Sequence, residues 1–329
     1  MATSTAAAGP VVGGPGQAAS SAGHPPARRR RQWGWSQEGA IFKNRWLPYA
    51  LIVPQLIITA VFFLWPTIRA IYESLQRSNA FGLGAVFSGL ANFATAVTQG
   101  GELNSLIVTL VFAAVTTALA MAIGLFLAVQ VEQVGRSKVI YRTLFIWTYA
   151  VPGAIAGALW LFLFQPGIGP GAHFLTALGV NWNFALHGNQ AFALIVVLVV
   201  WQQSAYNFLF FSAGLQIIPA QIVEAASVDG AGKLARFWRI VFPLLSPTTF
   251  FLVVLDILYA FFSSFAIIDV VTAGGPGTAT TTLVYQLYRD GFQNSNTGLA
   301  GAETVVLLVI AGIITVVQFR YLNRKVHYR

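Results

Sequence analysis

Six long apolar runs constrain this chain more than any other feature of its sequence. Each is long enough to cross a hydrocarbon layer of about 30 Å, which takes roughly 20 helical residues. The runs are continuously apolar, which favours helices, because the strands of a membrane barrel alternate between apolar and polar residues. We therefore predict an all-α membrane protein with six transmembrane helices near residues 47–70, 106–131, 140–164, 191–218, 248–268 and 304–321.

The overall composition agrees with a chain that is solvated by lipid. Hydrophobic residues make up 56% and charged residues only 9%, whereas a soluble domain carries roughly a quarter charged residues. There is no cysteine, which excludes disulfide bonds, thiol catalysis and thiolate metal sites. We predict no metal site, because the histidines are scattered through the tail and loops at His24, His173, His187 and His327.

The lysines and arginines predict the orientation of the chain. Cytoplasmic loops retain positive charge, and only Arg69, Arg77 and Arg289 fall on or near one side of the six predicted spans. The other side holds Arg28, Arg29, Arg30, Arg31, Lys43, Arg45, Arg136, Lys138, Arg142, Lys233, Arg236, Arg239, Arg320, Arg324, Lys325 and Arg329. Both termini are therefore predicted to be cytoplasmic. This placement explains the net charge of +9 without nucleic acid, and we expect residues 28–31 to contact the lipid bilayer at its headgroups.

Composition divides the chain into four parts. Residues 1–32 predict a disordered cytoplasmic tail, because their Ala, Gly, Ser and Pro residues bury too little surface to offset the entropy of ordering. The basic run follows these small residues, opposite to the order of a cleavable signal peptide. We expect the first transmembrane helix and first outer loop in residues 33–102, a transmembrane core in 103–322 and a basic cytoplasmic C-terminus in 323–329.

Three Gly-rich outer loops are expected near residues 71–105, 165–190 and 269–303. They carry few charges. Within the last of them, the sequence TAGGPG at residues 272–277 is typical of a tight turn. We favour a simple chain reversal there over a loop that faces a partner.

The loop between the fourth and fifth spans, residues 218–243, differs from all the others. Its sequence is IPAQIVEAASVDGAGKLARFWRIVFP. Pro219 suits the first position of a helix, and Gly230 and Gly232 supply backbone freedom that ends this helix. A second short helix over residues 233–240 is expected to stop before Pro243. The pattern predicts a helix, a glycine turn and a helix on the cytoplasmic face.

This loop offers a small knob with charges beside it. Ala225 and Ala226 permit close approach to another surface, and Glu224 and Asp229 add negative charge. Docking into a groove of a partner and a hairpin that merely joins two spans are both consistent with these residues. A phosphate-binding Walker loop is excluded, because Lys233 is followed by Leu234 instead of Ser or Thr.

The residues of the loop resemble a known family. Glu224, Ala225 and Ala226, then Gly230 and the terminal Ile240, Phe242 and Pro243 are spaced as in the EAA loop of ABC importer permeases. Phe242 stands where this family commonly has Leu, and both are bulky and apolar. Four further segments are similar to the permeases of bacterial sn-glycerol-3-phosphate importers of the A-subunit type, at residues 45–66, 206–219, 279–292 and 316–321.

The resemblance implies a type I ABC importer permease fold in the cell (inner) membrane, crossed several times. It implies three kinds of partner: a second, different permease subunit, two copies of a cytosolic ABC ATPase, and an extracytoplasmic solute-binding protein. ATP and Mg would be bound by the ATPase, so this chain would hold no cofactor and would not be an enzyme. The ATPase-coupling residues expected in the loop are Glu224, Ala225, Ala226, Asp229, Gly230 and Gly232.

The implied cargo is sn-glycerol-3-phosphate or a glycerophosphodiester such as glycerophosphocholine, and a sugar is the alternative within the same fold. None of the six spans carries a central cation that could hold a phosphate. We therefore expect phosphate selection to reside mainly in the solute-binding protein. A proton-coupled secondary transporter would need paired intramembrane charges or an inverted repeat, and a membrane enzyme would need a catalytic cluster. Neither signal is found.

Polar residues inside the spans are costly and mark candidate positions along the substrate path. In the fourth span, Gln203 and Asn207 share one helix face and Gln202 and Tyr206 share the next. They could line a polar path or make hydrogen bonds between helices. Asp256 lies near the middle of the fifth span. For Asp256 we favour a position facing a translocation cavity over a structural hydrogen bond, and we consider a proton relay improbable.

Overall fold

A computed structural model describes residue 9 and residues 46–78, 84–98, 100–134 and 138–325. The chain divides into two units, Met1–Leu56 and Ile57–Arg329. Apart from Gly9, the predictions for the tail at residues 1–32 lie outside the described residues, as do those for Lys43, Arg45, Arg136 and residues 326–329. In the first unit the structure describes the start of α1 (Trp46–Thr59), which contains Pro54.

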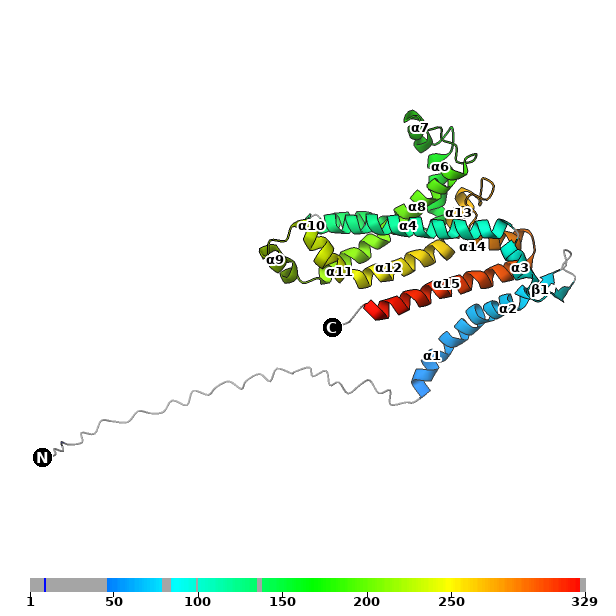
Figure 1. Cartoon of the computed structure of the whole chain (residues 1–329), viewed down its shortest axis with the longest axis horizontal. Coiled ribbons are helices and arrows are strands. Elements are labelled where there is room, and N and C mark those ends of the chain that lie inside the picture. Colours follow the sequence, from blue (N-terminus) through cyan, green and yellow to red (C-terminus); the bar gives the residue numbers. More distant parts are fainter. Residues whose placement is uncertain (1–8, 10–45, 79–83, 99, 135–137, 326–329) are drawn as a thin grey trace, which may run out of the picture. The chain divides into compact units, whose positions relative to one another are not determined.

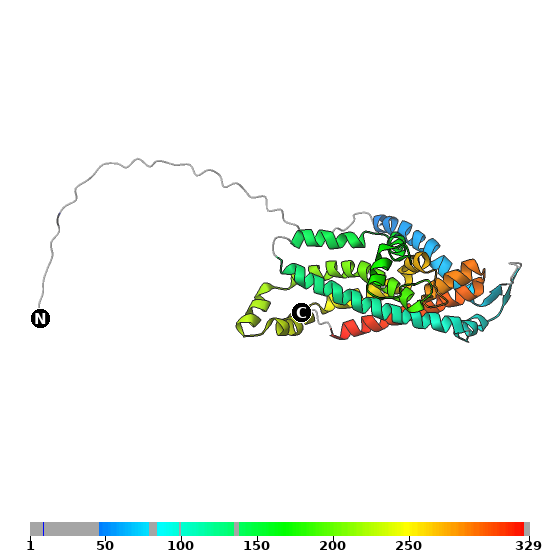
Figure 2. The ribbon, with the colours of Figure 1, turned by 90° about the horizontal axis from the view of Figure 1, so that it is seen from above.

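The second unit is built on long helices that run in nearly the same direction (Figures 1 and 2). They are α4 (Gly100–Glu132), α8 (Gly188–Ile217), α12 (Ser246–Leu258) and α15 (Thr297–Lys325). Together with the helix Pro48–Ser74, five helices among the described residues are long and apolar enough to cross a membrane. The predicted helical class is confirmed, and five of the predicted spans correspond to these helices.

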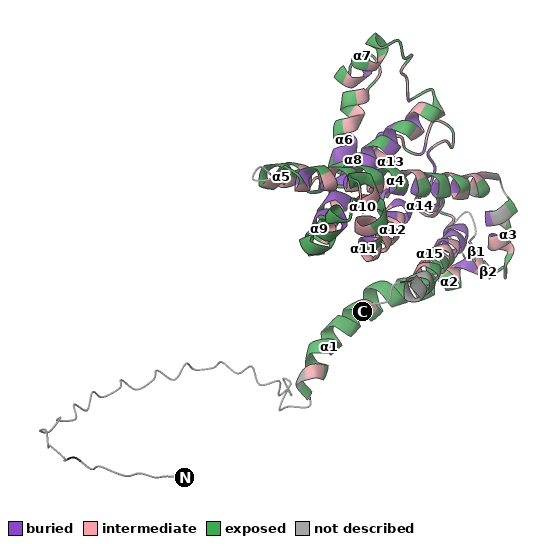
Figure 3. Cartoon of the chain, turned by 60° about the vertical axis from the view of Figure 1, so that its left-hand side comes forward, coloured by how far each residue is buried: buried purple, intermediate pink, exposed green. Residues whose placement is uncertain are grey.

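Helix α8 lies at the centre of the second unit. Within its most apolar window 72% of the residues are buried, compared with 28% for α15 and 22% for the span that contains α12, and Figure 3 shows the same concentration of buried residues on α8. Helix α4 approaches α8 closely at Gly124, because this residue has no side chain: a Cβ there would lie only 2.6 Å from the Cβ of Asn207. The polar residues of α8 are therefore placed in the interior.

The third predicted span is not one straight helix. Residues 140–164 form α5 (Lys138–Tyr149) and α6 (Gly153–Phe164), which meet at an angle of 91°. Pro152 explains the break, because it has no N–H to donate and disfavours helical geometry in the residue before it. Past the bend, α6 packs through Gly153 and Gly157 against α13 (Phe265–Val271). The prediction of a single continuous span is thus wrong in its geometry.

Short elements gather at the end of the second unit remote from residues 218–243, which we call the far end (Figure 1). Strands β1 (Gln76–Ser78) and β2 (Ala85–Phe87) pair antiparallel with Arg77 opposite Val86, and they are the one departure from the all-α prediction among the described residues. Asn92 donates hydrogen bonds to the carbonyls of Ser74 and Gln76 and holds this end together. The remaining short elements of the outer loops are α3 (Ala91–Thr98), α7 (Pro170–Ala177), α14 (Leu283–Tyr288) and the π-helical turn η5 (Arg289–Gln293).

Within the described residues, three more π-helical turns interrupt the helices. Two of them, η1 (Ala60–Leu64) and η3 (Phe237–Val241), are each followed two residues later by a proline, Pro66 and Pro243. The first leads into α2 (Trp65–Ser74). The third, η4 (Tyr259–Ser263), joins α12 to α13. Proline removes a backbone hydrogen bond from a regular helix. Wide π-helical turns occur where the regular i→i−4 hydrogen bonds are interrupted in this way.

The loop at the other end, which we call the loop end, forms α9 (Ala220–Val228), α10 (Lys233–Arg236), η3 and α11 (Phe242–Leu244). The predicted order of helix, turn and helix is present. The second helix does not stop before Pro243, however, but continues through it, because the wide turn η3 precedes the proline. Pro219 is the N-cap residue of α9 and not its first helical residue.

Candidate functional site

The turn of the loop is fixed by Gly230. Helix α9 ends with backbone hydrogen bonds from Asp229 to Ala225, from Gly230 to Ser227 and from Ala231 to Ala226. Gly230 has φ +80°, a left-handed conformation that favours glycine. Gly232 has φ −63°, which any residue can adopt. The prediction that both glycines are needed for backbone freedom therefore holds for Gly230 alone.

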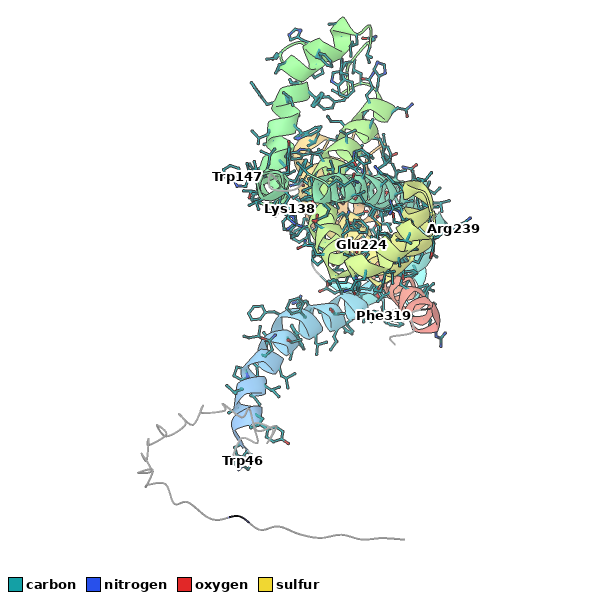
Figure 4. The ribbon with its side chains drawn as sticks, turned by 90° about the vertical axis from the view of Figure 1, so that its left-hand side faces the viewer. Trp46, Lys138, Trp147, Glu224, Arg239 and Phe319 are labelled. Atoms are coloured by element: carbon teal, nitrogen blue, oxygen red, sulfur yellow. The ribbon has the colours of Figure 1, made fainter. Side chains whose placement is uncertain are left out.

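The predicted coupling residues lie mostly on the surface of the loop end. Glu224, Ala225 and Asp229 are exposed, whereas Ala226 is buried against the chain itself. Neither carboxylate forms an ion pair with a described residue. Figure 4 looks onto this end, where Glu224 and Arg239 both lie on the face toward the viewer. The loop presents the exposed carboxylates of Glu224 and Asp229 together with the exposed cations of Lys233 and Arg239 to whatever lies beyond it.

A groove lies between this loop and the ends of α4 and α8. Its lining includes Glu132, Lys233 and Arg236. Glu132 accepts a hydrogen bond from Arg142 and lies 3.9 Å from the amine of Lys138, so it joins the end of α4 to the start of α5. Sequence analysis did not single out Glu132. Glu132 is the one acidic residue beside the basic residues 136, 138 and 142, and this contrast in the sequence could have marked it as an ion-pair partner.

Asp256 is the centre of a buried hydrogen-bond cluster between α8 and α12. Its Oδ1 accepts from Nε2 of Gln203 at 3.1 Å, and its Oδ2 accepts from Nδ2 of Asn207 at 2.8 Å. All three side chains are at most 5% exposed. Gln203 and Asn207 share one face of α8, as predicted, and both donate to the carboxylate of Asp256 from that face. The structure thus favours the structural hydrogen bond for Asp256 over the cavity-facing position that the sequence suggested.

Gln202 connects three helices in a similar way. Its Nε2 donates to the carbonyl of Val151 at 2.7 Å, at the bend between α5 and α6, and its Oε1 accepts from the hydroxyl of Tyr259 at 3.3 Å. A backbone carbonyl at a helix break needs such a partner when it is removed from water. Gln202 therefore serves the packing of the spans.

Beside these clusters lies an open groove of about 640 Å³. Of the predicted path residues, Gln203 and Tyr206 line it. The rings of Tyr206 and Tyr149 lie 5.1 Å apart between centroids. Sequence analysis missed the other polar lining residues, Tyr149, Tyr259 and Ser263. Tyr259 and Ser263 follow Asp256 by three and seven residues, and that helical spacing could have revealed them.

Comparison with known proteins identifies the family. Residues 120–328 match the family described as binding-protein-dependent transport system inner membrane component. The chain belongs to this family. It is also 50% identical over 288 residues to the sn-glycerol-3-phosphate transport system permease protein UgpA of Rhizobium meliloti (strain 1021), covering 88% of this chain and 98% of that relative.

Two solved structures share the fold of this family member. One is a bacterial ABC transporter involved in the import of the acidic polysaccharide alginate, with a TM-score of 0.74 and 20% identity over 86% of this chain and 96% of that one. The other is an alginate ABC transporter in complex with a pentasaccharide-bound periplasmic protein, with a TM-score of 0.73 and 20% identity over 85% and 94%. These structures show the fold, and the family match together with the 50% identical relative shows the role: the chain is an ABC importer permease, a multi-pass inner-membrane protein.

Two of the three arginines at the far end of this permease, Arg69 and Arg289, are engaged by neighbours on their own chain. Arg69 pairs with Glu73 at 2.8 Å. Arg289 donates to Gln286, which in turn donates to the buried Asp290, each at 2.6 Å. Neither arginine stands at the groove beside Asp256. The groove itself is lined among the described residues by neutral polar, aromatic and aliphatic side chains. Where phosphate is selected stays a prediction.

Proposed function

We propose that this chain is the permease subunit of an ATP-driven importer that carries sn-glycerol-3-phosphate into the cell. The identity of 50% over almost the whole length of a permease named for that substrate carries the proposal. A glycerophosphodiester such as glycerophosphocholine contains the same glycerol phosphate group and falls within the same proposal. The alginate transporters, at 20% identity, support the fold and not the substrate.

We further propose six spans with both termini in the cytoplasm, counting α5 and α6 together as one bent span. The distribution of charge supports this topology. Elements at the loop end carry Lys138, Arg142, Lys233, Arg236 and Arg239. The far end carries only Arg69, Arg77 and Arg289 among the described residues (Figure 1). Single cysteines introduced at each end of this cysteine-free chain would react with an impermeant reagent from opposite sides of the membrane. Labelling of both ends from one side would overturn the topology.

The loop end is proposed to dock on an ATPase. Two copies of a cytosolic ABC ATPase, which bind ATP and Mg, would drive this permease, a second, different permease subunit and an extracytoplasmic solute-binding protein through one transport cycle. Support comes from the exposed carboxylate of Glu224, which makes no ion pair with the described residues, and from the turn that Gly230 fixes behind it. Rigid-body movement of the spans would follow closure of the ATPase pair.

The groove beside Asp256 is proposed as this chain's share of the substrate path. Hydroxyl and amide groups from Tyr149, Gln203, Tyr206, Tyr259 and Ser263 line it. Such groups can exchange hydrogen bonds with a hydroxylated solute without holding it tightly. Gln202, Asn207 and Asp256 lie behind this lining and position it.

Reconstitution tests the function directly. The chain, its partner permease, the ATPase and the solute-binding protein are placed in proteoliposomes, and ATP-dependent uptake of sn-glycerol-3-phosphate, glycerophosphocholine and a disaccharide is measured. We expect uptake of sn-glycerol-3-phosphate, with or without uptake of glycerophosphocholine, and no uptake of the disaccharide. Uptake of the sugar alone would overturn the substrate, and uptake without the ATPase would overturn the importer.

A further inference from the structure

The segment between α6 and α8, residues 165–187, stands apart from the other outer loops in its charge. We call it the arm. It contains no Asp, Glu, Lys or Arg. The other outer loops carry charges such as Glu73, Arg289 and Asp290. A surface segment of this length in water normally carries several charged residues, since about a quarter of an ordinary soluble domain is charged.

The arm also exposes large apolar side chains. Ile168, Phe174, Leu178 and Leu186 are 69%, 65%, 65% and 72% exposed. Phe174 and Leu178 are four residues apart at α7 and share one side of the helix. Exposed apolar patches of this kind mark a surface that is covered by something other than water.

Some of the arm's polar groups form hydrogen bonds on its inner side, whereas the side chains of His173 and Thr176 are exposed. Trp182 donates through Nε1 to the carbonyl of Phe164 at 2.9 Å. Gln190 of α8 donates to the carbonyl of Asn181 and accepts from the backbone N–H of Asn183. Stacked and tilted aromatic contacts link Trp160, Phe164 and Trp182 on the same side. The arm is therefore fastened inward by hydrogen bonds and rings and leaves its apolar side chains outward.

The bend at Pro152 sets the direction of the arm. Helix α5 runs with the bundle in Figure 2, and α6 turns from it by 91°. In Figure 1, α6 and α7 accordingly stand out sideways from α4. If the long helices cross the bilayer, α5 enters it with them, and α6, at 91° to α5, runs along its plane at the outer end of the bent span. The arm joins the end of α8 that is remote from the loop end, so it belongs to the outer half of the membrane.

We propose that the arm lies in the outer lipid–water interface and holds the permease there, with Ile168, Phe174, Leu178 and Leu186 inserted among the lipids. Its occupant is the lipid itself and not a protein, because the arm carries no charged residue and turns at right angles to the spans, whereas the rim of a protein interface is polar. The exposed His173 and Thr176 supply the polar side that an interfacial helix turns toward the headgroups. The inference is independent of the substrate proposed above.

Site-specific fluorescence tests this placement. Because the chain has no cysteine, single variants Phe174→Cys and Leu178→Cys can be labelled with a small fluorophore in the complete importer, reconstituted in phosphatidylcholine vesicles. Thr176→Cys is the matched control, because Thr176 is exposed on the other side of the same helix. Ile168→Cys and Leu186→Cys give a second pair should either first variant fail to fold.

We expect lipid carrying a nitroxide near the top of its acyl chain to quench the labels at 174 and 178 strongly, since an interfacial helix buries its apolar side roughly 5–10 Å below the headgroups. The label at 176 should instead be quenched by aqueous iodide. Iodide quenching at 174 and 178 would overturn the proposal. It would also fail if lipid quenching at these positions vanished when the solute-binding protein or partner permease was added, because a protein would then be the occupant.

Discussion

Glu224 and Asp256 are both carboxylates of this permease, and their surroundings are opposite. Glu224 lies exposed on α9 and makes no ion pair with the residues that the structure describes. Asp256 is 3% exposed on α12 and accepts from two amides of α8. A charge that another chain must meet is left open, whereas a charge inside the membrane is satisfied by the fold itself. Four predictions test this difference.

Reversal of the open charge should have the largest effect. Glu224→Lys is expected to abolish uptake and weaken binding of the ATPase, because a lysine would repel whatever cationic partner receives the glutamate, while the variant still reaches the membrane. Uptake and co-purification of the ATPase are the measurements. Glu73→Lys at the far end is the matched control, since its pair with Arg69 is exposed and of little energetic consequence. Normal uptake by Glu224→Lys would remove the coupling role.

Removal of the buried charge should act on stability first. Asp256→Leu leaves the amides of Gln203 and Asn207 unpaired, at about 1–3 kcal/mol for each group, so we expect a lower thermal unfolding temperature in detergent. Asp256→Asn keeps one acceptor oxygen and should lose less. If Asp256→Asn stopped uptake without any change in unfolding temperature, Asp256 would act in transport directly and the comparison with Glu224 would fail.

The helix contact behind the buried cluster can be tested by size alone. Gly124→Val places a Cβ about where Asn207 stands, with 2.6 Å between the two Cβ atoms, and overpacking of this kind costs typically 1–3 kcal/mol. Gly312→Ala is the control, because nothing lies within 4 Å of a Cβ built there. The unfolding temperature of Gly124→Val should be lower than that of Gly312→Ala. Equal values would show that α4 and α8 are not tightly packed.

The smallest effect is expected within the loop. Gly230→Ala forces an L-residue into a left-handed conformation at a cost of roughly 1–2 kcal/mol, so the turn behind Glu224 should loosen and uptake should fall partially. Gly232→Ala should leave uptake unchanged, because its φ of −63° suits alanine. Equal effects of the two variants would mean that contact with the partner, and not backbone geometry, selects both glycines.

Much of this arrangement could be predicted from the sequence because length and spacing are local properties. Apolar runs long enough to span lipid located the long helices, and Gly230 marked a turn that the structure contains. The four-residue spacing of Gln203 and Asn207 placed them on one helix face, where both amides meet Asp256. Each of these inferences needs only the chain itself and the periodicity of a helix.

The parts that escaped prediction depend on neighbours distant in the sequence. Residues 140–164 were predicted as one span on their apolar length. Pro152 breaks this helix, and the direction that α6 then takes depends on its packing against α13. Asp256 was expected at a cavity because its amide partners lie 49 and 53 residues away. Strands β1 and β2 are three residues long, too short to show alternation. The wide turns η3 and η4 have no periodic signal of their own.

Gln202 turns the bend at Pro152 into a mechanical joint. The side-chain amide of Gln202 donates a hydrogen bond to the carbonyl of Val151 and accepts one from the hydroxyl of Tyr259. One side chain therefore links three spans at the same level of the bundle. When α8 moves, either α5 and α12 follow or one of these bonds is released. A small movement of α8 is thus passed to both neighbouring spans, and a larger movement must first break one of these two hydrogen bonds.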